Sequence, residues 1–288
     1  MVFCPENFSE QLPEIRFSWS LTRQKRLKFC SRAAVMHCRE AYYGSLPGAD
    51  DKLHQIYLQH CRISREEFLR RLLIKVMRES FYRHDTDPEN LQTFALDELE
   101  KSLQQMVFGR SRNILCEFDE PGASFNRIKR ELTSILAEKC LLLKNGAWSE
   151  LLNYPAEKRR FIDSPMSLQL NELFCFISPL CAVSDRGKFR IIELRNGGMG
   201  NSGRITALLH RFYIFNRYGK TPEMLDSLQL DLADGTLHLL ETDGSLSEIL
   251  NMISNDISIY QELLSMPLAE IPGNSTNCSR CVFNKICK

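Results

Sequence analysis

The stretch LFCFISPLCAVSDRGKFRIIELR, residues 173–195, decides the fold class of this chain. Two short apolar runs, 173–182 and 189–194, flank the turn sequence Asp185-Arg186-Gly187-Lys188, and this order is typical of a β-hairpin. The chain before this stretch has the apolar periodicity of helices. The sequence therefore predicts a mixed α/β (α+β) fold, helical in its first half and built on a sheet in its second.

Helices and a second pair of strands are predicted on either side of this hairpin. Before it, apolar periodicity and capping residues predict helices, the first beginning at Ser18 or Ser20, over residues 17–43, 51–84, 94–108 and 124–153. After it, the patterns predict a helix over 204–218, strands over 228–232 and 237–241, and a helix over 245–264.

The composition bounds the kind of protein. A chain of 288 residues with 43% hydrophobic content can bury a sizeable core and suits one elaborated domain, or a domain with a helical insertion. The formal net charge of +1 excludes a globally basic protein. The segment Arg16–Arg39 is nevertheless rich in Lys and Arg and has no acidic residue, so Arg23, Lys25 and Arg26 are candidate phosphate contacts. A solvated helix face is the alternative interpretation of this segment.

A fourth candidate phosphate contact is Arg204, which follows the glycine-rich segment Gly197–Gly203. Backbone amides of such a segment can also bind phosphate, but this one lacks the Lys-Ser/Thr ending of a nucleotide-binding loop. We expect Arg204 to contact a nucleic-acid phosphate, and the glycine-rich segment to be an ordinary connection.

The sequence indicates a reduced cytoplasmic protein that does not enter a membrane. Residues 1–14 have no secretory apolar segment, and no apolar run approaches the ~20 residues that a membrane span needs. In a reducing compartment, isolated cysteines are more often buried apolar side chains than disulfide partners. We expect this of six of the eleven cysteines, Cys38, Cys61, Cys116, Cys140, Cys175 and Cys181.

The C-terminal segment CSRCVFNKICK, residues 278–288, indicates a metal site. Its thiols, Cys278, Cys281 and Cys287, are one short of the four thiolates that a structural zinc ion or an iron–sulfur cluster takes. The fourth ligand must then come from elsewhere in the fold, and Cys30 is the candidate. Both iron and zinc accept four thiolates, and a segment of unligated cysteines is the remaining alternative.

Four segments of the chain resemble one known family. They are Ser18–Ala33, Tyr42–Ser45 with Ile56-Tyr57, Phe189–Gly197 and Cys278–Cys287. Together they resemble the RecB-like branch of the PD-(D/E)XK nucleases, which includes the CRISPR-associated iron–sulfur exonucleases of antiviral defence and the AddB-type helicase-nuclease domains. The resemblance spans nearly the whole chain.

The resemblance implies a fold and a cofactor. The fold is a restriction-endonuclease-like central mixed sheet flanked by helices, with a helical arm over residues 1–165, a nuclease-like core over 166–270 and a cysteine tail over 271–288. The cofactor is a structural [4Fe-4S] cluster that joins the N-terminal helix to the tail through four cysteines, Cys30, Cys278, Cys281 and Cys287. Zinc is the second choice of metal.

The catalytic positions of the family are not all filled in this chain. The nuclease mechanism uses an Asp and a second carboxylate to hold a divalent cation, and a Lys two residues further on. Glu193 matches the second carboxylate, but the first falls at Ser178 or Pro179, which bring no negative charge. Arg195 replaces the Lys and, because a guanidinium stays protonated, cannot transfer a proton.

Two more positions depart from the family pattern. Thr206 and His210 stand where many members have a Gln and a Tyr, and residues 72–77 contain no His where many have an additional metal ligand. The sequence therefore predicts a catalytically degenerate member, retained for binding or assembly in a prokaryotic DNA-processing or anti-phage defence complex. Its expected partners are single-stranded or branched DNA and other proteins.

An active nuclease is the alternative. It would be a DNA exonuclease dependent on Mg²⁺ or Mn²⁺, with Glu193 and a displaced carboxylate, Asp185 or Glu172, as ligands. Arg195 would then act only as an electrostatic stabiliser.

Overall fold

The structure, a computed structural model, describes residues 18–120, 122–170, 173–185, 187–195, 202–219, 224–241 and 245–287. The chain forms two compact units. Unit 1 contains the described residues of Met1–Arg62, Gln169–Phe176 and Leu250–Lys288, and unit 2 those of Ile63–Leu168 and Ile177–Ile249. Helices and strands occur together, so the chain is a mixed α/β protein, as the sequence predicts.

Unit 2 is built on a five-stranded mixed sheet in the order β10-β9-β8-β7-β4. The strands are β4 (Arg159–Phe161), β7 (Cys181–Asp185), β8 (Lys188–Arg195), β9 (Leu225–Asp231) and β10 (Leu237–Leu239). β8 and β9 are parallel, and the other neighbours are antiparallel. A parallel pair needs a crossover connection, and α9 (Ser202–Tyr218) lies between β8 and β9 in the chain. The predicted hairpin is confirmed as β7–β8, with Gly187 at φ 82° in its turn.

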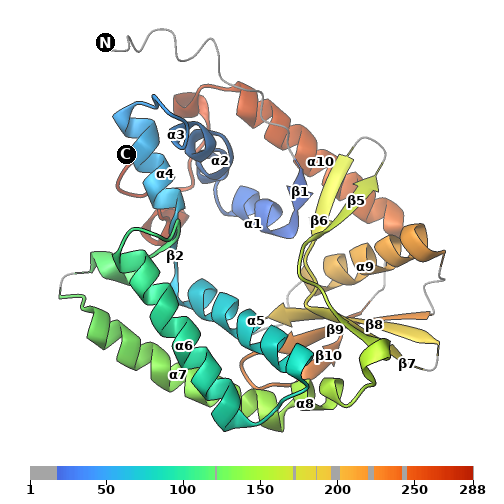
Figure 1. Ribbon diagram of the computed structural model, residues 1–288. Helices are drawn as coiled ribbons and strands as arrows, with labels where there is room; N and C mark the ends of the chain where they lie inside the picture. Colours follow the sequence, from blue (N-terminus) through green and yellow to red (C-terminus); the bar gives the residue numbers. More distant parts are fainter. Residues whose placement is uncertain are drawn as a thin grey trace. The chain divides into compact units, whose positions relative to one another are not determined.

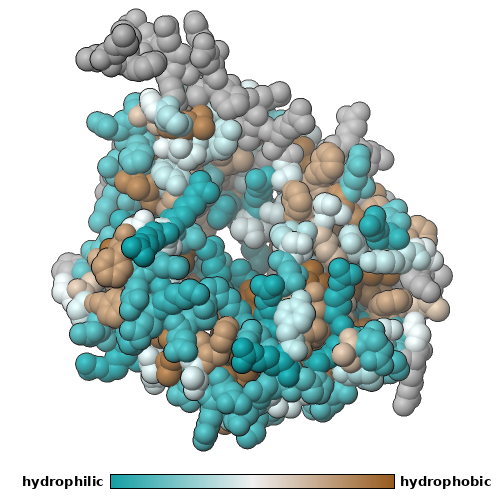
Figure 2. Space-filling model, viewed as in Figure 1, coloured by the Kyte–Doolittle hydropathy of each residue, from teal (hydrophilic) through white to brown (hydrophobic). Residues whose placement is uncertain are grey.

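The two faces of this sheet are covered by different helices. In Figure 1, α5, α6 and α7 lie on one side of the sheet and α9 on the other. The first side holds the larger core, in which Leu72, Leu99 and Leu132 are buried with Ile192 and Leu228 of the sheet. The solvent-facing surface over α6 and α7 is mostly hydrophilic in Figure 2, as expected of helices that bury one apolar stripe.

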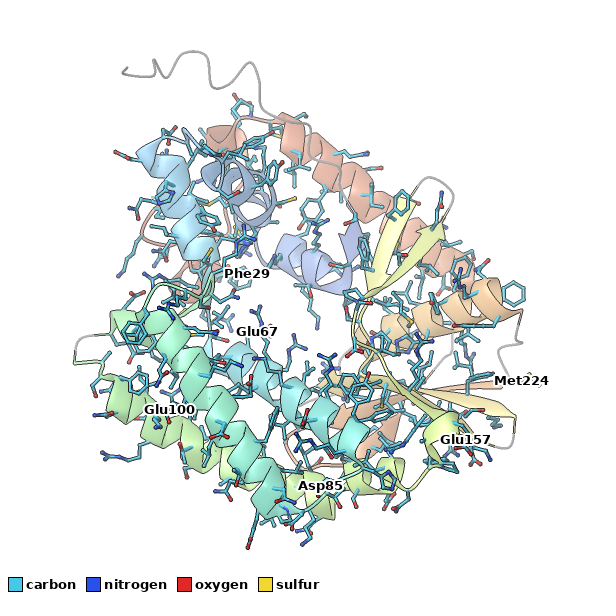
Figure 3. All side chains as sticks on the ribbon, in the orientation of Figure 1. Phe29, Glu67, Asp85, Glu100, Glu157 and Met224 are labelled. Carbon is cyan, nitrogen blue, oxygen red and sulfur yellow. The ribbon has the colours of Figure 1, made fainter. Side chains whose placement is uncertain are left out.

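The helices of unit 2 follow local sequence rules. They are α5 (Arg65–Arg83), α6 (Pro88–Val107), α7 (Phe125–Asn145) and α8 (Ala147–Leu152). The side chains of Ser64, Asp87 and Ser124 each accept a hydrogen bond from a backbone N–H of the first turn that follows. α6 and α7 are also joined by Glu100, labelled in Figure 3, whose carboxylate is 2.7 Å from Lys129 Nζ.

The segment predicted as one helix over 124–153 is interrupted at Gly146. A Cβ at this position would lie 2.7 Å from the carbonyl oxygens of Leu142 and Gly235. This close approach requires glycine and ends α7 before α8 begins.

The strand predicted over 173–182 is in fact two strands. β6 (Leu173–Ile177) and β7 belong to different sheets, and Ser178-Pro179-Leu180 separates them. Proline has no N–H to donate to a strand ladder, which explains the interruption. β6 pairs in parallel with β1 (Trp19–Ser20) in a three-stranded sheet that also contains β5 (Met166–Leu170).

Unit 1 contains the helices at both ends of the described chain. The N-terminal ones are α1 (Leu21–Phe29), α2 (Ser31–Val35), a π-helical turn (Met36–Glu40), α3 (Ala41–Gly44) and α4 (Asp51–His60). α10 (Leu246–Ser265) and the 3₁₀ turns Leu268–Glu270 and Ser275–Arg280 precede the cysteine tail. Ser20 caps α1 as predicted, but the helix ends at Cys30, where the backbone is extended (φ −169°, ψ 120°).

A buried polar network holds β1 and α1 against α10. Oδ2 of Asp256 accepts hydrogen bonds from Trp19 Nε1 at 2.9 Å and from Gln24 Nε2 at 2.8 Å. All three side chains are buried. The Tyr260 hydroxyl, one turn further along α10, donates to the Arg23 carbonyl at 2.9 Å.

The two units cut across the three segments expected from the sequence. Residues 63–165, expected to belong with the N-terminal helical region, group with the sheet because α5 to α8 share its core. The C-terminal tail groups with the first 62 residues. Within the described ranges, no helix has the length and apolar content needed to cross a membrane.

Four of the six isolated cysteines are buried as expected, namely Cys61, Cys140, Cys175 and Cys181, while Cys38 and Cys116 are half-buried. Burial raises the pKa of Cys140 from 9.0 to about 11 and that of Cys175 to about 12, and it raises the pKa of Cys181 as well.

These three thiols are expected to resist alkylation in the native protein. The thiolate is the reactive form, and a pKa about two units higher lowers its fraction about 100-fold. Peptide mapping by mass spectrometry after iodoacetamide treatment checks this, with urea-unfolded protein as the control. Rapid native labelling of Cys140, Cys175 and Cys181 would contradict their placement in the core.

Candidate functional site

The residues predicted to be catalytic lie on the face of the unit 2 sheet that α9 covers. Ile191 of β8 and Leu225 of β9 pack with Ile214 of α9, which identifies this face. Side chains two residues apart on a strand share a face, so Glu193 and Arg195 follow Ile191 towards the same helix.

The neighbouring strand adds two polar side chains to this row. The parallel register pairs Glu193 with Gln229 and Arg195 with Asp231. Arg195 Nη1 donates to Gln229 Oε1 at 3.3 Å, and Asp231 accepts a hydrogen bond from the Ala233 N–H at 2.8 Å. Gln229 and Asp231 are both buried. Glu193, Arg195, Gln229 and Asp231 therefore form a polar row under α9.

His210 of α9 completes this cluster. Its imidazole is fully buried, and Nε2 is 3.5 Å from Glu193 Oε1, an ion-pair distance without hydrogen-bond geometry. Neither ring nitrogen has a hydrogen-bond partner in the described part of the chain, nor has Nε2 of Gln229. Unpaired buried polar atoms cost stability, and in native proteins they often mark a functional position.

The sequence did contain a signal for His210. Buried Thr206 and Ile214 stand four residues before and after it, so all three belong to the sheet-facing stripe of α9. The sequence alone does not show that this stripe contacts Glu193 of β8.

The position expected for the first catalytic carboxylate contributes no acid. The β7–β8 register ends with Cys181 opposite Ile192, and the Leu180 N–H donates to that same Ile192 carbonyl at 2.7 Å, so the register gives Glu193 no partner on β7. Leu180 is a member of the apolar core on the other side of the sheet. Ser178 and Pro179, to which the sequence assigned this position, lie beyond it, between β6 and β7.

Asp185, the predicted substitute carboxylate, lies at the far end of the hairpin. It pairs in register with Lys188, and its Oδ2 is 3.9 Å from Arg190 Nη1. Glu193 is five residues further along β8, or about 16 Å at a strand's rise per residue. The structure thus does not bring Asp185 and Glu193 together, and Glu172, the other predicted substitute, lies outside the described residues. Among the described residues, no three His, Cys, Asp or Glu side chains are placed to hold a metal ion.

The cysteine tail of unit 1 lies against the junction of α1 and α2. The carbonyl of Phe29, labelled in Figure 3, accepts hydrogen bonds from the side-chain amides of Asn274 (3.2 Å) and Asn277 (2.7 Å). Arg32 Nε donates to the Ile271 carbonyl at 2.9 Å. These contacts bring the start of the tail to Phe29 and Arg32, which lie on either side of Cys30 in the chain.

The four predicted cysteine ligands are electrostatic neighbours. The pKa of Cys281 is raised first by burial and then by the thiols of Cys30, Cys287 and Cys278. Cys30 is buried, and the three tail cysteines are half-buried. Four thiols in one neighbourhood fit the donor set of a [4Fe-4S] cluster or a zinc ion, although the sulfur spacing of a closed site is not formed.

Phe283, between two of the tail cysteines, is anchored by a histidine that the sequence analysis did not single out. Phe283 is fully buried, and the His37 ring meets it edge-on, with centroids 4.6 Å apart. His37 Nδ1 is 3.0 Å from His60 Nδ1. Burial, and then the charges of Arg26 and His60, lower the pKa of His37 to about 3, so its ring is neutral and serves as a packing surface.

The candidate phosphate contacts are all engaged within the protein. Arg23 donates to Ser18 Oγ at 2.8 Å and also to the Ser18 carbonyl. Arg204 Nη2 pairs with Glu248 Oε2 at 3.0 Å. Lys25 and Arg26 also have partners.

These four residues do not make up one surface of a single unit, since Arg204 belongs to unit 2 and the other three to unit 1. Residues 197–201 of the glycine-rich segment lie outside the described residues. Neither the protein-family models nor the curated protein sequences contain a match to this chain.

Proposed function

We propose that this chain is a catalytically degenerate RecB-like protein of the cytoplasm that binds DNA, or serves as an architectural subunit, in a prokaryotic DNA-processing or anti-phage defence complex. The observation that carries the proposal is that Glu193 has no carboxylate opposite it on β7, where the register ends at Cys181 and the preceding Leu180 is buried in the apolar core. The order β7, β8, α9, β9, with β8 and β9 parallel, supports the family assignment because the resemblance implies a mixed sheet with flanking helices.

The charges around Glu193 do not suit metal-dependent phosphodiester hydrolysis. Mg²⁺ dehydrates reluctantly and depends on carboxylates and phosphates for tight placement. Arg195 stands where the family has its Lys, stays protonated, and already donates to Gln229. Of the carboxylates that the resemblance predicts on β7 and β8, only Glu193 is placed to bind a cation here.

The four-cysteine neighbourhood supports a structural role for unit 1. Cys30, Cys278, Cys281 and Cys287 would hold a [4Fe-4S] cluster, with zinc as the second choice. The bound group would supply a cross-link between the α1–α2 junction and the tail, which the hydrogen bonds to Phe29 already place together.

A metal-dependent exonuclease remains the second candidate function, and His210 is the observation that favours it. Its unpaired Nε2 and the Glu193 carboxylate form a nitrogen–oxygen donor pair at 3.5 Å. Such a pair suits Mn²⁺ or another transition ion better than Mg²⁺. Asp185 is too far from Glu193 to complete that site.

A cleavage and mobility assay in the same tubes separates the two candidates. Anaerobically purified protein is incubated with end-labelled single-stranded, branched and duplex DNA, with Mg²⁺ or Mn²⁺, beside its Glu193→Gln variant. The exposed Glu138→Gln on α7 is a matched control. We expect retarded but intact DNA with all three proteins. Cleavage that Glu193→Gln abolishes and Glu138→Gln retains would overturn the proposal in favour of the nuclease.

A further inference from the structure

Unit 2 has a concave surface that none of the site predictions includes. It is a groove of about 1000 Å³, lined by the end of α5, residues 156–167, part of the β7–β8 hairpin and the end of α9. Glu157, labelled in Figure 3, marks its β4 side. On β8 the groove reaches Phe189 and Ile191 but not Glu193. This volume is at the upper end of the range of about 300–1,000 Å³ for small-ligand pockets, so the groove has room for an extended ligand.

Two exposed aromatic rings flank this groove and are held in place. Tyr82 is 59% exposed; its hydroxyl donates to Asp163 at 2.9 Å, and the Arg78 guanidinium lies 5.8 Å from its ring centre. Tyr218 is 54% exposed and packs edge-on against Tyr213 at 6.4 Å. Exposed aromatic rings that are held in place are suited to stacking against the bases of a single strand.

The charged lining of the groove is predominantly basic. It comprises four cations, Lys158, Arg159, Arg160 and Arg217, and two acids, Glu157 and Asp163. Asp163 is neutralised by Arg78, whose Nε lies 2.8 Å away. Lys158, Arg160 and Arg217 are exposed and have no side-chain partner among the described residues.

Arg159 adds an independent indication of an anionic ligand. Its guanidinium lies 4.7 Å from the Phe81 ring centre, and one of its terminal nitrogens contacts His84 Nδ1. Nε and Nη1 are buried and have no hydrogen-bond partner within the described chain. Buried N–H groups of a cation without an acceptor are costly, and a phosphate oxygen is the kind of acceptor that a guanidinium prefers.

We propose that this groove binds a single-stranded polynucleotide. Its bases stack on Tyr82 and Tyr218, and its phosphates lie against Lys158, Arg159, Arg160 and Arg217. An acidic peptide would use the charges but leave the exposed rings without a matching partner, and a rigid duplex would bury its bases away from them. The inference rests on the proposed nucleic-acid role of the chain but assigns it to a surface separate from Glu193 and from Arg23, Lys25, Arg26 and Arg204.

The charge contribution is tested with Arg160→Gln/Arg217→Gln. The matched control is Arg130→Gln/Lys144→Gln, which removes the same charge from the exposed face of α7, outside the groove. Affinities for labelled oligo-dT, oligo-U and a DNA duplex are measured by fluorescence anisotropy over a range of salt concentrations. We expect the groove variant to bind oligo-dT about ten-fold more weakly at low salt, with a log–log salt slope shallower by about 1.4, while the control stays within about two-fold of wild type.

The stacking contribution is tested separately with Tyr218→Ala. Loss of a stacked base weakens binding by roughly five- to 150-fold and leaves the salt slope unchanged, because no phosphate contact is removed. Tyr218→Phe keeps the ring and should retain wild-type affinity. Thermal melts of all variants show that each is folded before its affinity is compared.

The outcomes separate this inference from the proposed function. If the wild type binds DNA but the groove variant and the control variant weaken that binding equally, or not at all, the groove is not the binding site. The proposed function would then stand. Failure of the wild type to bind any oligonucleotide would overturn the groove and the DNA-binding form of the proposed function, and would leave only the architectural role. The single-strand assignment of the groove would also be overturned if the protein bound the duplex more tightly than oligo-dT. The same holds if poly-glutamate displaced the labelled oligonucleotide as efficiently as unlabelled oligo-dT does. Equal affinities for oligo-dT and oligo-U would support a site that recognises a single strand but does not distinguish deoxyribose from ribose.

Discussion

Cys30→Ser is expected to remove the iron or zinc that we propose for the four-cysteine site and to destabilise unit 1 by more than about 3 kcal/mol, because metal-binding free energy adds directly to folding free energy. Cys30 stands between α1 and α2, next to the tail cysteines that raise the pKa of Cys281 together with it. Its loss leaves three thiolates, one too few for a closed four-thiolate site. Metal and sulfide analysis, a visible spectrum and urea unfolding measure the two effects.

Cys61→Ser is the matched control for this substitution. Cys61 is also a buried cysteine of unit 1, 5% exposed, and takes no part in the proposed site. It should show only the modest cost of burying a hydroxyl and should retain the metal. Equal metal content in both variants, with equal losses of stability, would contradict the assignment of Cys30 as a ligand.

Asp256→Ala is expected to lower the free energy of unfolding by about 3 kcal/mol. The substitution leaves Trp19 Nε1 buried without an acceptor and leaves Gln24 Nε2 with only the thioether of Met252, 3.0 Å away, and each lost bond to the carboxylate costs roughly 1–3 kcal/mol. Asp256→Asn should cost less, since its amide oxygen can still accept from both donors. Urea denaturation followed by far-ultraviolet circular dichroism measures the change.

Glu262→Ala is the control for Asp256→Ala. Glu262 lies on the same helix, α10, but is exposed, and it has no side-chain partner among the described residues. We expect a change within about 0.5 kcal/mol. A loss at Asp256→Ala no larger than this would mean that Trp19 and Gln24 find other acceptors and that the network does not hold α1 to α10.

The regular elements could largely be predicted because their signals are local. Ser20 and Ser124 mark helix starts as predicted, and the apolar spacings continue through α5, α6 and α7. The single helix predicted over 51–84 is in fact two helices, α4 and α5, because the chain is extended at β2 (Arg62–Ile63) and Ser64 caps a new helix. The other main failure is non-local. The run 173–182 has a uniform strand pattern, and only the pairing of β6 with β1 shows that its two halves enter different sheets.

The candidate site was predictable only to the extent that strand geometry dictates it. Two-residue spacing puts Glu193 and Arg195 on one face, as the sequence implies. The meeting of His210 with Glu193 depends on how α9 crosses the sheet, and the groove combines four separate segments of the chain. Asp256 was missed although it shares the buried stripe of Ile253 and Tyr260, because a lone acid on a helix usually faces solvent.

The most direct test of the central claim, that Glu193 does not form a metal site, is Mn²⁺ binding to the protein measured by electron paramagnetic resonance. The wild type and Glu193→Gln are titrated side by side in the presence of a short single-stranded DNA. We expect both proteins to leave the signal of free Mn²⁺ unchanged, apart from weak binding that is the same in both. A stoichiometric site in the wild type that Glu193→Gln abolishes would contradict it and would identify Glu193, with His210 beside it, as the centre of an active nuclease.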